Sequence, residues 1–199
     1  MQAIHILGAS GSGTSTLGKA LSERFGCAWI DTDSIYWEQT DPPFQVSRPF
    51  GERVRMIEEA MRANPRCVIS GWMGSAGDAF LSRFNLIIWL HVPTELRIRR
   101  LRAREATRFG LRILPGGDMY ETHQAFLDYA GQYDEGGMDI RSYARQKKWL
   151  EQAACPMLEL DGARGLEELV AEVALWLSSK RPVFALQPPE LRISFVIRS

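Results

Sequence analysis

A glycine-rich stretch that joins an apolar run to an amphipathic segment limits most strongly what this chain can fold into. Residues 8–16 read Gly-Ala-Ser-Gly-Ser-Gly-Thr-Ser-Thr. The apolar run 2–7 suits a buried strand, and residues 14–25 place Leu17 and Leu21 on one face of a helix. A strand, a glycine turn and a helix in this order are typical of a loop whose backbone N–H groups surround phosphate oxygens. We therefore predict a phosphate site at this loop.

The loop matches the pattern G-x-x-x-x-G-K-[ST] at all of its fixed positions except one. Gly8, Gly13 and Ser15 match it, whereas Thr14 stands at the lysine position. In this pattern the lysine reaches the phosphates, and the hydroxyl that follows, here that of Ser15, binds Mg²⁺. The predicted phosphate-binding residues are Gly8, Gly11, Ser12, Gly13, Thr14, Ser15 and Thr16. The sequence thus predicts a phosphate site that lacks one of its usual charges.

Composition narrows the classes of partner. The 199 residues include 24 Lys and Arg and 24 Asp and Glu, so the formal net charge is zero. Such a chain has no global field that would recruit nucleic acid or a membrane surface. We find no signal peptide and no apolar run long enough to span a bilayer, and the cysteines show no metal-ligand spacing. We expect a cytoplasmic protein that acts on a small molecule.

Apolar runs and helical patterns alternate along the chain, which predicts a parallel sheet covered on both faces. Strands are expected at 2–7, 27–31, 67–70, 86–92 and 157–160, and helices at 14–25, 50–63, 94–108, 119–132, 138–153 and 164–179. The predicted fold class is therefore α/β, a three-layer α/β/α fold with a five-stranded parallel sheet and a helical lid. Residues 1–180 would form one domain, with the lid at about 104–145.

Residues 181–199 form a tail with a pattern of its own. Leu191, Ile193, Phe195 and Ile197 alternate with Arg192, Ser194, Val196 and Arg198. This period suits an edge strand that pairs with another subunit, and an unstructured tail fits the sequence equally well. The expected state is a monomer, or a dimer formed through the tail.

Two acids, Asp31 and Asp33, follow the second expected strand. In a parallel sheet the end of this strand would lie beside the phosphate loop. Two carboxylates there can hold Mg²⁺ through water and accept a proton from a substrate hydroxyl. We predict that Asp31 serves the metal and that Asp33 is the general base. Asp is also a favoured N-cap, and Asp33 could cap the next helix while Asp31 acts on the metal.

The third expected strand ends in Ser70-Gly71 without an acid. A glycine there would let a substrate approach the backbone closely. The connection 38–49, which contains prolines, ends near Arg48. We predict that Arg48 and Gly71 contact the phosphate acceptor.

Arginines crowd the segment 97–112. Arg100 and Arg104 are four residues apart and share one helical face. Their planar guanidinium groups suit a base ring or phosphate oxygens. Their neighbours Arg97, Arg99 and Arg102 are expected on a solvated basic face. Arg141 and Arg145 repeat the four-residue spacing on a later helix.

These motifs resemble the nucleoside-monophosphate-kinase branch of phosphate-loop proteins over residues 1–179. The run 87–93 followed by Arg100-Leu101-x-x-Arg104 is similar to adenylate kinase. The Asp31-x-Asp33 pair resembles shikimate and gluconate kinases, and the loop resembles bacterial adenylate-kinase-related proteins without an established substrate. The resemblance implies ATP and Mg²⁺, with Arg100 at the base, Arg104 at the phosphates and Asp33 facing a hydroxyl acceptor.

Three functions remain open. The first is an ATP-dependent small-molecule kinase in which Arg104 or Arg145 supplies the charge that Thr14 lacks. The second is a nucleotide-binding regulatory protein with weak or no phosphoryl transfer. The third is a nicotinamide-dependent reductase, suggested by Tyr143-x-x-x-Lys147 and disfavoured because Thr16 stands where the third glycine of its fingerprint belongs.

Overall fold

The computed structural model describes residues 2–179, so the predicted tail pattern lies outside the described residues. The strands are β1 (Gln2–Gly8), β2 (Ala28–Asp31), β3 (Arg66–Ser70), β4 (Phe84–His91) and β5 (Met157–Asp161). They form one sheet in the order β2-β3-β1-β4-β5, and every adjacent pair is parallel. The predicted α/β class with a five-stranded parallel sheet is therefore confirmed.

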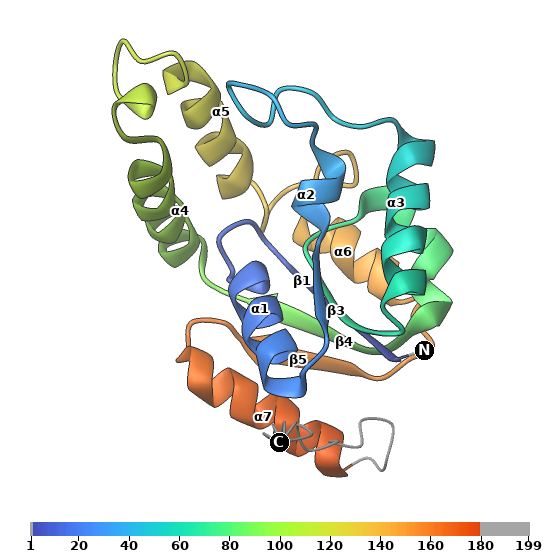
Figure 1. The fold of residues 1–199 in the computed structure, drawn as a ribbon. Helices are drawn as coiled ribbons and strands as arrows, with labels where there is room; N and C mark the ends of the chain where they lie inside the picture. The colour runs from blue at the N-terminus through green and yellow to red at the C-terminus, as the bar shows by residue number, and fades with distance from the viewer. Residues whose placement is uncertain (1, 180–199) are drawn as a thin grey trace, which may run out of the picture.

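Helices cover both faces of this sheet (Figure 1). They are α1 (Thr14–Phe25), α2 (Thr32–Tyr36), α3 (Phe50–Ala63), α4 (Thr94–Phe109), α5 (Tyr120–Gly131), α6 (Tyr143–Leu150) and α7 (Leu166–Ser179), with 3₁₀ segments η1 (Gly74–Arg83) and η2 (Gly110–Ile113). Most of the predicted helices begin and end within two residues of these bounds. The exception is 138–153, where the helix is limited to α6.

The alternation of side chains along β1 builds a core on each face of the sheet. Ile4 and Ile6 point to the side where α1 and α7 contribute Leu17 and Val173. Leu7 points to the other side, where α3, η1 and α6 pack. Burying one such aliphatic side chain stabilises the fold by about 1.5–3 kcal/mol. The central strand is therefore fixed from both faces, and so is the loop that leaves its carboxyl end.

The α4–α5 pair extends beyond the sheet as an arm that includes η2 (Figure 1). This arm falls within the predicted lid of about 104–145, and its motion as a lid stays a prediction. Its base is fixed by Arg97, which is 0% exposed. The Arg97 guanidinium donates to the carbonyls of Val92 and Ala130 and pairs with Asp134 at 3.0 Å. The expectation that Arg97 lies on a solvated face was wrong, because its side chain joins the start of α4 to the end of α5.

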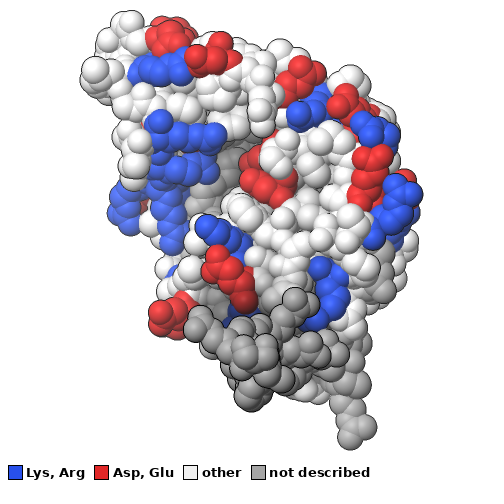
Figure 2. Space-filling model, in the orientation of Figure 1, with Lys and Arg blue, Asp and Glu red and all other residues white. Residues whose placement is uncertain are grey.

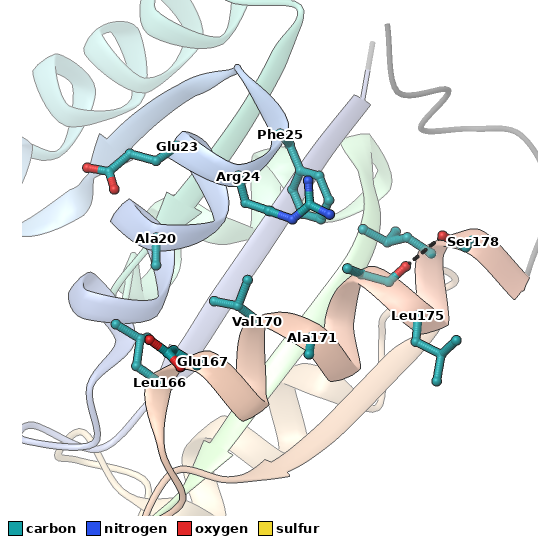
Figure 3. A pocket seen from close by; sticks show the side chains of 12 residues that line it. Ala20, Glu23, Arg24, Phe25, Leu166, Glu167, Val170, Ala171, Leu175 and Ser178 are labelled. Carbon is teal, nitrogen blue, oxygen red and sulfur yellow. Dashed lines mark hydrogen bonds between the residues drawn. The ribbon is translucent and has the colours of Figure 1, made fainter. Parts of the chain in front are cut away.

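A groove of about 700 Å³ lies along the carboxyl half of α1 beside α7 (Figure 3). Apolar side chains such as Val170 and Leu175 line it, together with Phe25 and the charged Glu23 and Arg24. It follows the carboxyl half of α1, whereas the glycine loop precedes the amino end of the same helix. The candidate site described next is therefore a different place in the fold.

Candidate functional site

The glycine loop has the backbone that its sequence predicts. Gly11 and Gly13 have φ values of 81° and 95°, a left-handed region that favours glycine. At Gly8 a Cβ atom would stand 2.7 Å from the Leu90 carbonyl oxygen and 2.6 Å from the Ser12 hydroxyl oxygen. A side chain at Gly8 would therefore clash with β4 and with the loop itself.

The loop leaves polar groups that an anion could bind. The Ser12 side chain is 1% exposed, and within residues 2–179 its Oγ has no hydrogen-bond partner. Gly13 precedes α1 without a side-chain cap, so the first-turn N–H groups of a 12-residue helix stay available. The helix dipole adds partial positive charge at the same point. These features fit the phosphates of a nucleotide.

The lysine position contributes no cation. Thr14 is buried in the first turn of α1, and Ser15 is half-buried beside it. Lys19, the next lysine along α1, is exposed, as its place on the helix predicts. A cation for the loop must therefore come from another element.

The two acids stand at the end of β2, where Asp31 pairs in register with Ser70 of β3. Asp31 caps α2, because its Oδ1 accepts a hydrogen bond of 3.2 Å from the Asp33 N–H. The suggestion that Asp33 is the cap was wrong. Asp33 is exposed in the first turn of α2 and leaves its carboxylate free of the capping role.

The electrostatic surroundings of Asp31 connect it to α4. Burial raises the pKa of its carboxyl, and the nearby Asp33 raises it further. The hydrogen bond from the Asp33 N–H and the charges of Arg104 and Arg108 lower the pKa and partly offset these effects. Figure 2 shows basic side chains gathered over α4 across a hollow from acidic side chains near α2. An anionic ligand between them would meet cations from one side only.

Gly71 allows α2 to begin close to the end of β3. Its φ is 105°, and a Cβ there would stand 2.2 Å from the Thr32 Oγ1 and 3.9 Å from the Asp33 Oδ1. Thr32 also donates to the Ser70 carbonyl at 2.9 Å. The structure therefore brings Gly71 and Asp33 close together, which a shared acceptor site requires. Contact of Gly71 with an acceptor stays a prediction.

Arg48 uses its guanidinium to hold the protein together. One nitrogen donates to the carbonyls of Ser34 and Ile35 at 3.2 Å each, and it also contacts the Trp37 carbonyl. Its Nε lies 3.6 Å from Glu52. Arg48 thus joins the end of α2 to the start of α3, and its predicted contact with an acceptor stays a prediction.

The two arginines of α4 have different surroundings. Arg100 donates to the Gly162 carbonyl at 2.9 Å. A Cβ on Gly162 would stand 2.9 Å from the Ser12 carbonyl oxygen, so Arg100 lies near the glycine loop. Arg104 pairs with Glu105 at 2.7 Å, and its side chain is 56% exposed. The predicted roles of Arg100 at a base and Arg104 at phosphates stay predictions.

Arg141, which the site prediction left out, is the arginine that contacts the glycine loop. Its Nη2 donates to the Gly8 carbonyl at 2.6 Å, and its Nη1 lies 3.5 Å from the Ser10 Oγ. Arg145 lies one turn further on and donates to the Asp139 carbonyl at 3.5 Å. The sequence showed that Arg141 and Arg145 share a helical spacing, but it gave no reason to prefer Arg141.

A buried hydrogen-bond network holds α6 against the loop. Gln146 donates to the same Gly8 carbonyl at 3.1 Å. Its Oε1 accepts from the Tyr133 hydroxyl at 2.6 Å and from the Trp89 indole at 3.1 Å. All three side chains are buried, so each polar group depends on the others. The loop is thereby connected to β4 and to the segment before α6.

The residues still to be placed are the histidine of β1 and the predicted magnesium ligands. His5 is buried in β1 and stacks on Phe84, which confirms that it is packed in the core. Within residues 2–179 no group of three or more His, Cys, Asp or Glu is placed to hold a metal ion. The predicted ligands Ser15 and Asp31 would therefore need phosphate or water oxygens to complete a magnesium site.

The fold and the loop define a phosphate-loop protein of the nucleoside-monophosphate-kinase-like class. A family profile described as an AAA domain matches residues 4–111, and the chain belongs to this family. "Uncharacterized protein YqaC" of Bacillus subtilis (strain 168) is 40% identical over 176 residues, covering 88% of this chain and 97% of that protein.

Kinases are among the other similar proteins. The shikimate kinase of Nostoc punctiforme is 29% identical over 116 residues, which cover 53% of this chain and 62% of that enzyme. This match spans less than two thirds of the enzyme's length. The solved shikimate kinase from Acinetobacter baumannii in complex with shikimate has a TM-score of 0.53 at 17% identity, covering 90% of this chain and 94% of that one. Deoxyadenosine kinase from M. mycoides has a TM-score of 0.51 at 16% identity, covering 90% and 100%. These structures show the fold.

Among residues 2–179, no helix has the length and apolar character needed to cross a membrane.

Proposed function

We propose that this protein is an ATP-dependent kinase that phosphorylates a hydroxyl group of a small molecule. One observation carries the proposal: Asp33, at the start of α2, lies against Gly71, the residue that follows β3. β3 lies between β2 and β1, whose carboxyl end opens into the phosphate loop. The carboxylate and the loop therefore share one edge of the sheet, where parallel α/β folds bind their ligands.

Phosphoryl transfer requires mainly that the protein position the two substrates and neutralise the charge on the phosphates. The acceptor oxygen forms a bond to the γ-phosphorus, and the bond from that phosphorus to the β–γ bridging oxygen breaks. The electron pair leaves with ADP, and Asp33 takes the hydroxyl proton. Mg²⁺, held by Ser15 and through water by Asp31, would neutralise charge on the phosphates. Arg104, whose charge lowers the pKa of Asp31, would add positive charge from α4.

The similar proteins support a hydroxyl acceptor. Their printed names include shikimate kinase, a sugar kinase from Janibacter sp. and deoxyadenosine kinase, and these substrates carry hydroxyl groups. The choice between a nucleotide and a hydroxylated metabolite as the acceptor is open to test. We also propose a cytoplasmic location, because the three cysteines are free thiols, as in a reducing compartment.

A panel of acceptors tests this proposal. The purified protein is incubated with ATP and Mg²⁺ and with nucleosides, nucleoside monophosphates, sugars or hydroxy acids, and ADP and new phosphate esters are followed by ³¹P NMR. We expect one acceptor class to give a phosphate ester. Binding of ATP without transfer to any of them would refute the proposal.

A regulatory nucleotide-binding protein is the second candidate, and Thr14 is the observation that favours it. Loss of a charge at the transferred phosphate ordinarily reduces the rate by orders of magnitude. In this case ATP would bind and stabilise the fold, while the acceptor panel would give no product.

A further inference from the structure

We propose that Arg141 supplies the positive charge that the phosphate loop lacks at Thr14, and that it binds the nucleotide phosphates directly. The inference rests on the proposed nucleotide site, but it does not require that phosphoryl transfer takes place. It replaces the expectation that Arg104 or Arg145 takes this role.

The first argument is position. The Arg141 guanidinium bonds to the Gly8 carbonyl at 2.6 Å and lies 3.5 Å from the Ser10 hydroxyl oxygen. Gly8 begins the loop and Ser10 lies within it, so the cation spans one side of the phosphate cradle. The contact joins residues 133 positions apart in the sequence, and it places a fixed positive charge beside the loop that precedes α1.

The second argument is unmet bonding capacity. Arg97, Arg104 and Arg112 each pair with a carboxylate. In the part of the chain that the structure describes, Arg141 has no such ion pair, and its buried Nε has no hydrogen-bond partner. A half-buried guanidinium with a buried, unpartnered nitrogen and no ion pair has lost hydration that nothing replaces. A phosphate beside the loop would provide both a counter-charge and an acceptor.

The electrostatics agree with this placement. Burial lowers the pKa of the Arg141 guanidinium, and the charge of Asp33 is the largest effect that raises it. Arginine stays charged in proteins, so the desolvation is a cost that an anionic ligand would relieve. The influence of Asp33 also indicates that Arg141 lies within electrostatic reach of the proposed base.

The third argument is pre-organisation. The backbone N–H of Arg141 donates to the Tyr129 hydroxyl at 3.0 Å. Ser142 caps α6 by accepting from the Arg145 N–H and donates its own hydroxyl to the Gly137 carbonyl at 2.7 Å. Gln146 adds a second bond to Gly8. Arg141 is thus held at the loop by its own segment.

The other nearby cations are less suited to the role. Lys19 is exposed on α1, Arg100 donates to the Gly162 carbonyl, and Arg145 donates to the Asp139 carbonyl in the segment before α6. Arg141 is the one among these whose guanidinium contacts the loop. Its planar fork can bind two phosphate oxygens, which a lysine ammonium does not do in the same geometry.

The test measures the dissociation constants of ATP and adenosine by calorimetry for the full chain and for Arg141→Gln. We expect ATP affinity to fall roughly 10- to 100-fold, the range for a lost charge-assisted bond. Adenosine carries no phosphate, so its affinity should change by less than about twofold, within the scatter of a neutral change. Lys148→Gln, at an exposed position of α6, is the control and should leave both affinities unchanged.

A rescue experiment separates charge from structure. Introducing Thr14→Lys into the Arg141→Gln protein should restore most of the ATP affinity, because a lysine there reaches the same phosphates. In the unmodified protein, Thr14→Lys should raise the ATP affinity only slightly. The effects of the two substitutions on ATP affinity should therefore be non-additive. If Arg141→Gln folds poorly, Arg141→Lys gives the same comparison and should lose less affinity.

Two results would overturn the inference: ATP affinity unchanged in Arg141→Gln, or an equal loss for ATP and adenosine. Neither readout uses an acceptor. A protein that binds ATP through Arg141 but transfers no phosphate would therefore support this inference while refuting the proposed kinase activity.

Discussion

At the scale of single residues, the site depends on glycines whose replacement the surroundings forbid. Gly8, Gly11 and Gly71 each have a backbone atom or a rigid side chain within 2.7 Å of an added Cβ atom. Gly11 and Gly71 also have positive φ values. The sequence pattern predicted the first two from the loop motif. Gly71 was predicted for a substrate's approach, whereas the structure shows a further reason: it lets α2 begin against β3.

Gly71→Ala should destabilise the protein by about 1–3 kcal/mol, because the φ of 105° and the Thr32 hydroxyl both oppose a side chain. Urea unfolding followed by tryptophan fluorescence gives the free energy of unfolding. Gly51→Ala in α3, where nothing lies within 4 Å of the added Cβ, is the control. It should be stabilising by up to about 1 kcal/mol, since alanine favours the helix. Equal effects at the two positions would contradict this account.

Burial of His5 should make the stability of the protein sensitive to acid. Burial lowers its pKa from 6.5 to about 4, while a hydrogen bond to the Ile69 carbonyl raises it slightly. The folded state therefore binds the proton more weakly than the unfolded chain, so stability falls as pH drops from about 6.5 towards 4. The loss from this group should approach about 3 kcal/mol. His5→Phe should reduce the difference between unfolding free energies measured at pH 7 and pH 4.5; an unchanged difference would refute the assignment.

At the scale of elements, the strands and most helices could be predicted because their apolar periodicity is strong. The short α2 and the 3₁₀ segment η1 could not, because one or two turns leave no clear period. The helix expected at 138–153 begins only at Tyr143, since Ser142 caps it in an extended conformation. This late start is what leaves Arg141 outside the helix and beside the loop. A contact across 133 positions has no local signal, which is why the prediction chose Arg104 or Arg145.

The buried hydrogen-bond network between α6 and the phosphate loop should depend on Gln146. Replacing Gln146 with leucine would leave the Gly8 carbonyl, the Tyr133 hydroxyl and the Trp89 indole with fewer partners. The expected loss of stability is about 1–3 kcal/mol for each group left unsatisfied. Thermal or urea unfolding measures it. Gln152→Leu, at an exposed position after the same helix, should change stability by less than about 0.5 kcal/mol. A loss of the same size in both variants would contradict a stabilising role for this hydrogen-bond network.

At the scale of the whole molecule, groups from distant parts of the chain lie together at the carboxyl ends of the strands. The phosphate loop, the acids of α2, the arginines of α4 and the Arg141 segment all meet there. The sequence predicted this location from the alternation of strands and helices and from the loop motif. It did not predict which cation completes the loop, because that depends on how α6 packs.

The measurement that tests the central claim most directly is the rate of phosphate-ester formation by the unmodified protein and by Asp33→Asn, with ATP affinity measured in parallel. The account predicts that Asp33→Asn slows transfer by about 10²- to 10⁴-fold, the range for a lost general base, with ATP affinity unchanged. Ser34→Ala, at the next exposed position of α2, should transfer at the normal rate. Equal rates for Asp33→Asn and the unmodified protein, or ATP binding without any ester, would contradict a kinase that uses this carboxylate.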